Sequence, residues 1–452
     1  MNFKELLTSL DAFLWGGPLA FLVLALGVFL TVKFKFIQVK RLREALSLLF
    51  KRPTSEVGEI SPFAALCTTL SATIGTGNII GVATAIAAGG PGALFWMELS
   101  AFFGMAIKYL EGTLAVKYRI TKNGRTRGGP FYYIEKGMGK AFLPLAYFFA
   151  LSGLISTLFG MGTLIQSNSI ADGLCSFFSG SNNEDFIHFG NVSFSSVSVL
   201  TAIIIALLSG MIICGGIKRI SRVSEILVPA MAFIYVSACL VIVIGRIEKL
   251  PSVVYLIIKT AFSPSAVLGA ASGITVREAL RWGVSGGVFT NEAGLGISSI
   301  ADGEAKCESC EKQGLLSMTA VFFDTTVMCT LTGLAVLITD SVSTKETGSF
   351  IAQNAFVTGL PLKDEISAFI LTACLCFFAF STVTGYCHYG EECLLYITKG
   401  RFVKLYRILY VAAVFSGPFF SVPVVWTLAR VLNALMALPN LFALFYLSVK
   451  EK

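Results

Sequence analysis

The sequence predicts an all-α polytopic membrane protein, and its composition and hydropathy are the reasons. Of the 452 residues, 55% are hydrophobic and only 14% are charged, and the mean hydropathy is +0.77. Roughly 20 consecutive apolar residues let a helix cross a bilayer, and such stretches recur along the whole chain. A soluble core could not bury this much apolar surface.

Hydrophobic length predicts eleven transmembrane helices. The predicted spans are residues 13–32, 62–88, 92–116, 142–170, 196–216, 223–245, 253–298, 314–339, 365–391, 403–422 and 424–448. The first is longer than the apolar part of a signal peptide, so we expect it to be retained. Most of the 35 basic residues fall in alternate loops, which predicts a cytoplasmic C-terminus and an N-terminus outside. The net charge of +8 therefore reflects topology and attraction to anionic lipid, with no nucleic-acid partner expected.

The second predicted span contains the sequence SATIGTGNIIGVA, residues 71–83. Glycine in a helix interior costs about 1 kcal/mol relative to alanine, and a freed backbone group in lipid has no water to bind. Gly75 and Gly77, flanked by hydroxyl groups and by Asn78, therefore predict a helix that opens inside the protein. Close helix packing of the GxxxG type, through Gly77 and Gly81, is the alternative.

A second interruption is predicted in the seventh span, where Gly269, Ser272 and Gly273 lie near the middle. Interrupted spans at corresponding positions of two halves are typical of the substrate site of a secondary transporter. Each half has five predicted spans, so the halves enter the membrane from opposite sides. The predicted divisions are an N-terminal helix with a basic loop, a first inverted repeat and a second inverted repeat, at residues 1–61, 62–248 and 249–452.

An opened helix offers two kinds of backbone group to a ligand. The half that begins near Asn78 presents free N–H groups and the positive end of its dipole, which suit a carboxylate. The half that ends near Ile74 presents free carbonyl oxygens, which suit a hard cation such as Na⁺. An amino-acid zwitterion together with Na⁺ satisfies both ends.

Long stretches of the chain carry a family resemblance: SATIGTGNIIGVATAIAAGGPGALFWM, KYLEGTLAVKYR, GGPFYYIEKG, GVFTNEAGLG, FFAFSTVTGYCHYGEE and LMALPNLFALFYLS. In them the sequence resembles the alanine/glycine:cation symporter family. The resemblance implies a leucine-transporter-type fold of five plus five inverted-repeat helices with one extra N-terminal helix. It also implies Na⁺-coupled import of alanine or glycine through the inner membrane of a prokaryote, and we expect a monomer.

The resemblance assigns roles residue by residue. The residues that match the turn holding the substrate carboxylate are Gly75, Thr76, Gly77 and Asn78. Gln166 matches a side chain of the substrate pocket, although it could instead bridge two helices. Tyr386 follows Thr382 by one helical turn and could cap that pocket.

The resemblance also implies a Na⁺ site. The hydroxyls of Ser381 and Thr382 match a pair that binds Na⁺ together with backbone carbonyls near Ser71 and Ile74. Without the family, two such hydroxyls would more often bond back to their own helix. The positions that depart from the family pattern are Glu98, Gly286, Tyr386, Thr427 and Arg430. None lies in the GTGN turn or in the hydroxyl pair, so they bear on substrate preference and gating.

Ionisable residues within spans are costly and often functional. We expect Arg281 to take a structural or gating role in the inner half of the seventh span, and Glu292 to lie near its inner end. Lys108 and Glu111 are expected to reach towards the membrane surface at the inner end of the third span.

The residues leave other functions to be weighed. Proton coupling in place of Na⁺ would need a carrier such as Asp324 or Glu98. TIGTGN is similar to a carbonyl filter, but channel filters are rings built from several chains. An enzyme is not expected, because no catalytic triad, carboxylate pair or set of histidine ligands is recognisable. Cys307 and Cys310 form a CxxC pair without a second pair of ligands.

Overall fold

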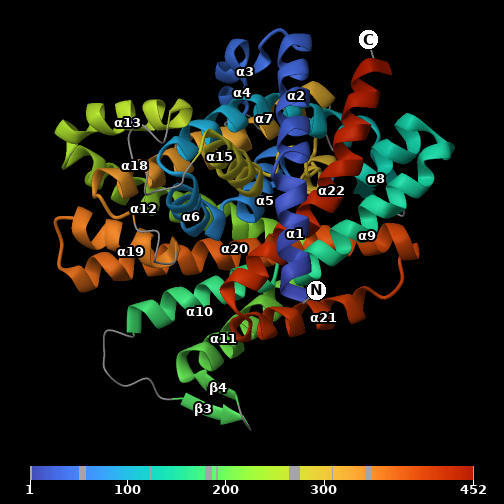
Figure 1. The fold of residues 1–452 in the computed structure, drawn as a ribbon. Coiled ribbons are helices and arrows are strands. Elements are labelled where there is room, and N and C mark those ends of the chain that lie inside the picture. Colours follow the sequence, from blue (N-terminus) through green and yellow to red (C-terminus); the bar gives the residue numbers. More distant parts are fainter. Residues whose placement is uncertain are drawn as a thin grey trace.

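The computed structural model describes residues 3–49, 57–122, 124–178, 186–189, 192–263, 275–307, 309–342 and 348–450. These residues are helical almost throughout, and the exceptions include two short hairpins (Figure 1). In the hairpins, β1 (Ile120–Lys122) pairs antiparallel with β2 (Arg125–Arg127), and β3 (Phe186–Phe189) pairs with β4 (Val192–Ser195). The predicted all-α class is therefore confirmed.

The first half of the chain opens with four helices that precede the interrupted span. They are α1 (Phe3–Trp15), α2 (Pro18–Lys33), α3 (Ile37–Lys40) and α4 (Leu42–Leu48). The next span consists of α5 (Pro62–Thr73), a 3₁₀ turn at Thr76–Asn78 and α6 (Ile80–Gly89). The helix interruption that the sequence predicts at Gly75–Gly77 is thus present in the structure.

Capping explains where this span begins. Ser61 Oγ accepts a hydrogen bond from the amide of Ala64 at 2.9 Å, and Pro62 occupies the first helical turn. A side-chain acceptor and a proline in these positions favour a helix start. At the other end, Gly90 ends α6 with φ 74°, a left-handed conformation that suits glycine.

Longer helices complete the first half. They are α7 (Gly92–Lys117), the short α8 (Pro130–Tyr133), α9 (Leu143–Phe159), α10 (Leu164–Phe178), α11 (Ser196–Ile213) and α12 (Gly216–Ile244). α7 packs against α2, and it also packs against α15 (Val276–Asn291) and α17 (Cys310–Val321) of the second half.

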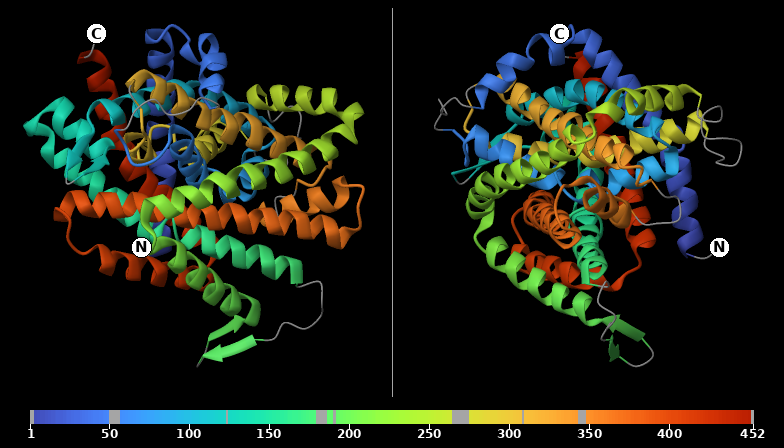
Figure 2. Two further views of the ribbon diagram at one scale, coloured as in Figure 1. Left: turned by 180° about the vertical axis from the view of Figure 1, so that it is seen from behind. Right: turned by 90° about the vertical axis from the view of Figure 1, so that its left-hand side faces the viewer.

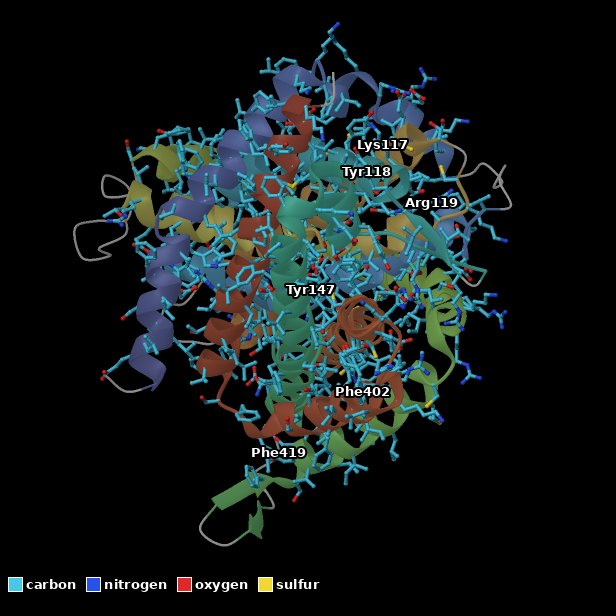
Figure 3. All side chains as sticks on the ribbon, turned by 90° about the vertical axis from the view of Figure 1, so that its right-hand side faces the viewer. Lys117, Tyr118, Arg119, Tyr147, Phe402 and Phe419 are labelled. Carbon is cyan, nitrogen blue, oxygen red and sulfur yellow. The ribbon has the colours of Figure 1, made fainter. Side chains whose placement is uncertain are left out.

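The second half contains the remaining helices. Besides α15 and α17 they are α13 (Leu250–Phe262), α16 (Ser299–Gly303), α18 (Thr330–Ile338), α19 (Gly348–Gly359), α20 (Asp364–Thr398), α21 (Val403–Ser416) and α22 (Val422–Lys450). A π-helical stretch, Phe322–Cys329, joins α17 to α18. α20 runs through the interior, where it contacts α5, α9, α10 and α12; the right-hand panel of Figure 2 looks along it.

The seventh predicted span also opens within the described residues. The predicted break at Gly269, Ser272 and Gly273 lies outside the described residues. α15 continues through the nearby glycines because they allow close packing: a Cβ on Gly283 would collide with the carbonyl oxygen of Ala93 in α7. The described chain leaves the helix after Asn291, where residues 292–298 are non-helical.

The described residues contain eight helical segments long and apolar enough to cross a membrane. These are Glu5–Lys33, Gly92–Lys117, Lys140–Phe178, Ser196–Ile213, Gly216–Ile244, Cys310–Ile338, Asp364–Thr398 and Val422–Lys450. The other predicted spans consist of shorter helices, namely α5 with α6, α13 with α15, and α21. The chain is therefore a polytopic membrane protein in which backbone breaks shorten several of the predicted spans.

Candidate functional site

The turn between α5 and α6 exposes two backbone carbonyls. The amide of Gly75 donates to Asn78 Oδ1 at 3.1 Å, and the amide of Asn78 donates to the carbonyl of Gly75 at 3.2 Å. In a continuous α-helix these two amides would bond the carbonyls of Ser71 and Ile74. Because both amides bond within the turn, the buried carbonyl oxygens of Ser71 and Ile74 lose their usual helical hydrogen-bond donors.

Two hydroxyls of α20 face these carbonyls. Ser381 Oγ lies 3.3 Å from Ser71 O, and Thr382 Oγ1 lies 3.5 Å from Ile74 O. Both hydroxyls also contact the carbonyl of Phe378 in their own helix, at 2.8 and 3.0 Å. A hydroxyl has a single proton to donate. If each proton goes to Phe378, hydroxyl lone pairs face carbonyl lone pairs, an arrangement that a cation between them would stabilise.

Gln166 lies beside the same turn. It belongs to the first turn of α10, just after the chain breaks between α9 and α10. Its Oε1 accepts from the amide of Thr76 at 3.4 Å, and its Nε2 donates to the carbonyl of Met161 at 3.0 Å. A Cβ on Gly75 would lie 2.7 Å from Thr382 Oγ1 and 3.4 Å from Gln166. Glycine at position 75 is thus what lets α10 and α20 approach the turn this closely.

One polar atom of the turn has no protein partner. The hydroxyl of Thr76 is fully buried, and no hydrogen bond to it is found among the described residues. A buried hydroxyl without a partner costs free energy, so a polar ligand that bonds to Thr76 would be favoured.

Asn78 connects the turn to the π-helical stretch of the second half. Its Nδ2 donates to Asp324 Oδ1 at 2.8 Å and to the carbonyl of Asp324 at 3.0 Å. Thr325 donates to the other carboxylate oxygen of Asp324 at 3.0 Å, and Asn291 donates to Thr325 at 3.0 Å. Asp324 is therefore a buried, hydrogen-bonded carboxylate.

Tyr386 lies between two broken helices. Its hydroxyl donates to the carboxylate of Glu292, the first residue after α15. Its Cβ lies so close to Gly162, in the break between α9 and α10, that a side chain at position 162 would be crowded. The side chain of Glu292 is fully buried.

The expectation that Lys108 and Glu111 reach towards the membrane surface is wrong, because both side chains are fully buried. Lys108 Nζ lies 3.6 Å from Glu111 Oε2 and donates to Ser298 Oγ. Glu111 Oε1 accepts from the amide of Gly294 at 3.1 Å and from Asn440 at 2.7 Å. These bonds hold the non-helical segment 292–298, whose own backbone groups need partners in lipid.

Replacing Lys108 by Met is expected to destabilise the folded protein by about 3–5 kcal/mol, because it leaves the Glu111 carboxylate buried without a cation. The double variant Lys108→Met with Glu111→Gln should recover much of this loss. Thermal unfolding of the detergent-purified protein measures both. Equal stability of wild type and Lys108→Met would contradict the ion pair.

The charged end of α15 lies beside the first helix. Arg281 is 3.5 Å from Asp11 of α1, and Arg430 of α22 donates to the same carboxylate at 2.8 Å. The Arg430 guanidinium also stacks over Trp282 at 4.6 Å. Arg281 and Glu292 lie towards opposite ends of α15.

A cavity of about 370 Å³ borders these residues, with Asp11, Asp172, Trp282, Trp426 and Arg430 in its wall. Trp426 stacks on Phe289, with ring centroids 5.1 Å apart. A Cβ on Gly77 would lie 3.3 Å from the Phe289 ring. The stacked pair therefore separates this cavity from the opened turn.

The structure brings most of the predicted site residues together. The group comprises Ser71, Ile74, Gly75, Thr76, Asn78, Gln166, Ser381 and Thr382, with Tyr386 one helical turn further along α20. Gly77 lies in the same turn. Gly269, Ser272 and Gly273 lie outside the described residues. The sequence argument missed Thr290 and Asn291, whose only signal is the polar run at the end of α15, and Thr325 in the π-helical stretch.

Known proteins are similar to this chain along its full length. Residues 1–451 match the family described as the sodium:alanine symporter family. The sodium/alanine symporter AgcS of Methanococcus maripaludis is 41% identical over 99% of this chain and 95% of its own. An uncharacterized transporter of Haemophilus influenzae is 46% identical over 98% of this chain and 93% of its own.

A solved structure is similar in fold. The crystal structure of MhsT in complex with L-phenylalanine aligns with a TM-score of 0.60 and 14% identity, covering 86% of this chain and 89% of that one. Together with the full-length family match, these findings place the chain among transporters and not among enzymes. The chain belongs to the sodium:alanine symporter family.

Proposed function

We propose that the protein imports small neutral amino acids, alanine or glycine, by Na⁺-coupled symport with alternating access. One observation supports this most strongly. The carbonyls of Ser71 and Ile74, freed by the GTGN turn, face the hydroxyls of Ser381 and Thr382 across 3.3 and 3.5 Å. Four buried oxygens without a formal charge suit a monovalent hard cation.

The amino acid is proposed to bind on the other side of the same turn. Backbone N–H groups between Gly75 and Asn78 would hold the carboxylate, helped by the positive end of the α6 dipole. Thr76 Oγ1, which is buried without a partner, and Gln166 would supply further hydrogen bonds. Tyr386 would limit the space for the substrate side chain.

The second repeat is proposed to complete this pocket. Gly269, Ser272 and Gly273 remain candidates on the sequence pattern alone. The non-helical segment 292–298 is a further candidate, because its first residue, Glu292, already contacts Tyr386.

Coupling follows from the shared turn. Na⁺ between α5 and α20 would fix the conformation of residues 75–78, so the substrate would meet a site that is already ordered. Linkage then requires the substrate to increase Na⁺ affinity by the same factor. The stacked pair of Phe289 and Trp426 is proposed to separate this site from the cavity beside Arg430, from which substrate would enter.

We propose an inverted repeat of residues 62–248 and 249–452 after an extra N-terminal helix, with eleven crossings in total. The similarity in fold to MhsT and the two openings of the backbone support this arrangement. The distribution of basic loops supports an N-terminus outside and a cytoplasmic C-terminus. A monomer is proposed as the working unit.

Uptake into proteoliposomes tests the proposal. Labelled alanine should accumulate when Na⁺ is higher outside, and accumulation should disappear when K⁺ replaces Na⁺. Empty liposomes and an equal Na⁺ concentration on both sides are the controls. Accumulation that is independent of the Na⁺ gradient would reject Na⁺ coupling. Uptake of glycine without uptake of alanine would show that glycine is the substrate.

Proton coupling is the second candidate, because the buried carboxylate of Asp324 contacts Asn78 in the turn itself. The same liposomes separate the two. Accumulation in Na⁺-free buffer driven by an inward proton gradient, and its loss in Asp324→Asn, would favour the proton. No accumulation under that gradient would favour Na⁺.

A further inference from the structure

A cluster of three metal-ligating side chains lies away from the transport site. Glu304, His388 and Glu392 each place one ligand atom within 4.8 Å of the other two, and all three are buried. His388 Nε2 lies 2.9 and 3.0 Å from the two carboxylate oxygens of Glu304. In the part of the chain that the structure describes, no other such group of histidine, cysteine and carboxylate residues is found.

Two separate elements form the cluster. His388 and Glu392 are four residues apart on α20, a spacing that puts both side chains on one face of the helix. Glu304 follows α16, and its carbonyl accepts from the amide of Glu59 at 2.8 Å. Lys306, two residues further, donates its amide to Ile60 at 2.8 Å. The position of Glu304 is thus fixed by backbone pairing and not by the cluster alone.

The cluster borders a cavity of about 330 Å³, which has room for water as well as an ion. Among the described residues, Glu392 Oε2 has no hydrogen-bond donor, although the residue is 95% buried. Arg127 Nε lies 3.4 Å from this oxygen. A buried carboxylate oxygen without a hydrogen bond costs free energy. Arg127 therefore does not satisfy Glu392 Oε2, and this oxygen is available to bind an ion.

Outside the cluster, the wall of the cavity carries four cationic side chains and two carboxylates. The cations are Arg125, Arg127, Lys218 and Arg407, and the carboxylates are Glu59 and Glu391, of which Glu391 is paired with Arg407 at 2.8 Å. Within the cluster, a divalent ion would neutralise the two carboxylates of Glu304 and Glu392. A protonated His388 would release one proton on binding, and Nε2 of the resulting neutral imidazole would supply the third ligand. Arg127 would lose its contact with Glu392 but would still border the cavity.

We propose that Glu304, His388 and Glu392 bind a divalent first-row transition metal ion, with Zn²⁺ as its best probe. One imidazole nitrogen and two carboxylate oxygens match the ligands that zinc accepts, and cavity water supplies the remaining positions. The ion would join α20, which carries Ser381 and Thr382, to the segment that follows α16. This site is independent of the proposed symport, since it uses none of the residues of the opened turn.

Metal binding to the full-length protein in detergent tests the proposal. After EDTA treatment and removal of the chelator, Zn²⁺ should raise the midpoint of thermal unfolding in a saturable manner, because an ion that binds the folded state stabilises it. Co²⁺ in place of Zn²⁺ should give visible absorption that Zn²⁺ displaces. His388→Gln keeps a polar group beside Glu304 but removes the imidazole, and should weaken Zn²⁺ affinity at least about tenfold.

Matched variants make the result decisive. Glu392→Gln should weaken Zn²⁺ binding as His388→Gln does, whereas Glu391→Gln, in the same cavity and outside the cluster, should retain it. The unfolding midpoint in EDTA establishes that each variant is folded. No Zn²⁺ effect on the wild type would overturn the proposal and leave an ion-pair network. An effect that persists in both cluster variants would overturn it in favour of another site, such as the thiols of Cys307 and Cys310.

Discussion

Replacing Ser381 and Thr382 together by alanine is expected to raise the Na⁺ concentration for half-maximal uptake at least about tenfold. The double variant removes two of the four oxygens that surround the proposed Na⁺ position. A loss of only about 1.4 kcal/mol of binding free energy corresponds to a tenfold change in affinity. Initial rates of alanine uptake into proteoliposomes at a series of Na⁺ concentrations measure the shift.

Thr384→Ala is the matched control for this pair. Thr384 is a buried hydroxyl on the same helix, and it donates to the carbonyl of Ser381 at 2.8 Å. Its replacement should leave the Na⁺ dependence nearly unchanged. If the double variant has the Na⁺ dependence of the wild type, the Na⁺ site lies elsewhere.

Replacing Asn78 by leucine is expected to abolish uptake while the protein still inserts into the membrane. The substitution removes the acceptor for the Gly75 amide and the donor to Asp324. Each buried group left unpaired costs about 1–3 kcal/mol, so the turn would lose the conformation that frees the carbonyls. Uptake per amount of protein, quantified by size-exclusion chromatography of the extracted membranes, is the measurement.

Asn354→Leu, the same chemical change in the part-buried face of α19, is the control and should transport normally. Uptake by Asn78→Leu at more than about a tenth of the wild-type rate would mean that the turn does not depend on Asn78. A protein that fails to insert would be recognised by its absence from the membrane fraction, and Asn78→Ser would then replace it.

The first interruption could be predicted because its causes are local. Gly75 and Gly77 weaken the helix, and the side chain of Asn78 replaces a helical acceptor three residues away. The Na⁺ candidates on α20 could not be found in this way. Their role depends on contacts with α5, about 310 residues earlier in the sequence, and they were predicted only through the family resemblance.

The opening after Asn291 could not be found from the sequence for a related reason. The glycines near position 285 look like a break, but Gly283 and Gly287 are there because α7 passes too close for side chains. The actual departure after Asn291 is stabilised by Glu111 and Lys108 of α7, more than 180 residues earlier in the chain. A hydropathy argument predicts that Lys108 and Glu111 lie near the membrane surface. It cannot show that each has a partner inside the protein.

The residue pattern also could not reveal the cluster at Glu304. His388 and Glu392 are four positions apart, which by itself is common on a helix, and the third ligand is 84 residues away. Only the packing of α20 against the segment after α16 brings them together. Sequence patterns find sites whose residues are close along the chain, and tertiary structure is needed for the rest.

Equilibrium binding of alanine to the purified protein, with and without Na⁺, tests the central claim most directly. If the ion and the substrate share one opened turn, Na⁺ should increase alanine affinity, and alanine should increase Na⁺ affinity by the same factor. Ser381→Ala with Thr382→Ala should remove this mutual effect while weak alanine binding remains. Alanine affinity that does not change with Na⁺ in the wild type would contradict the account.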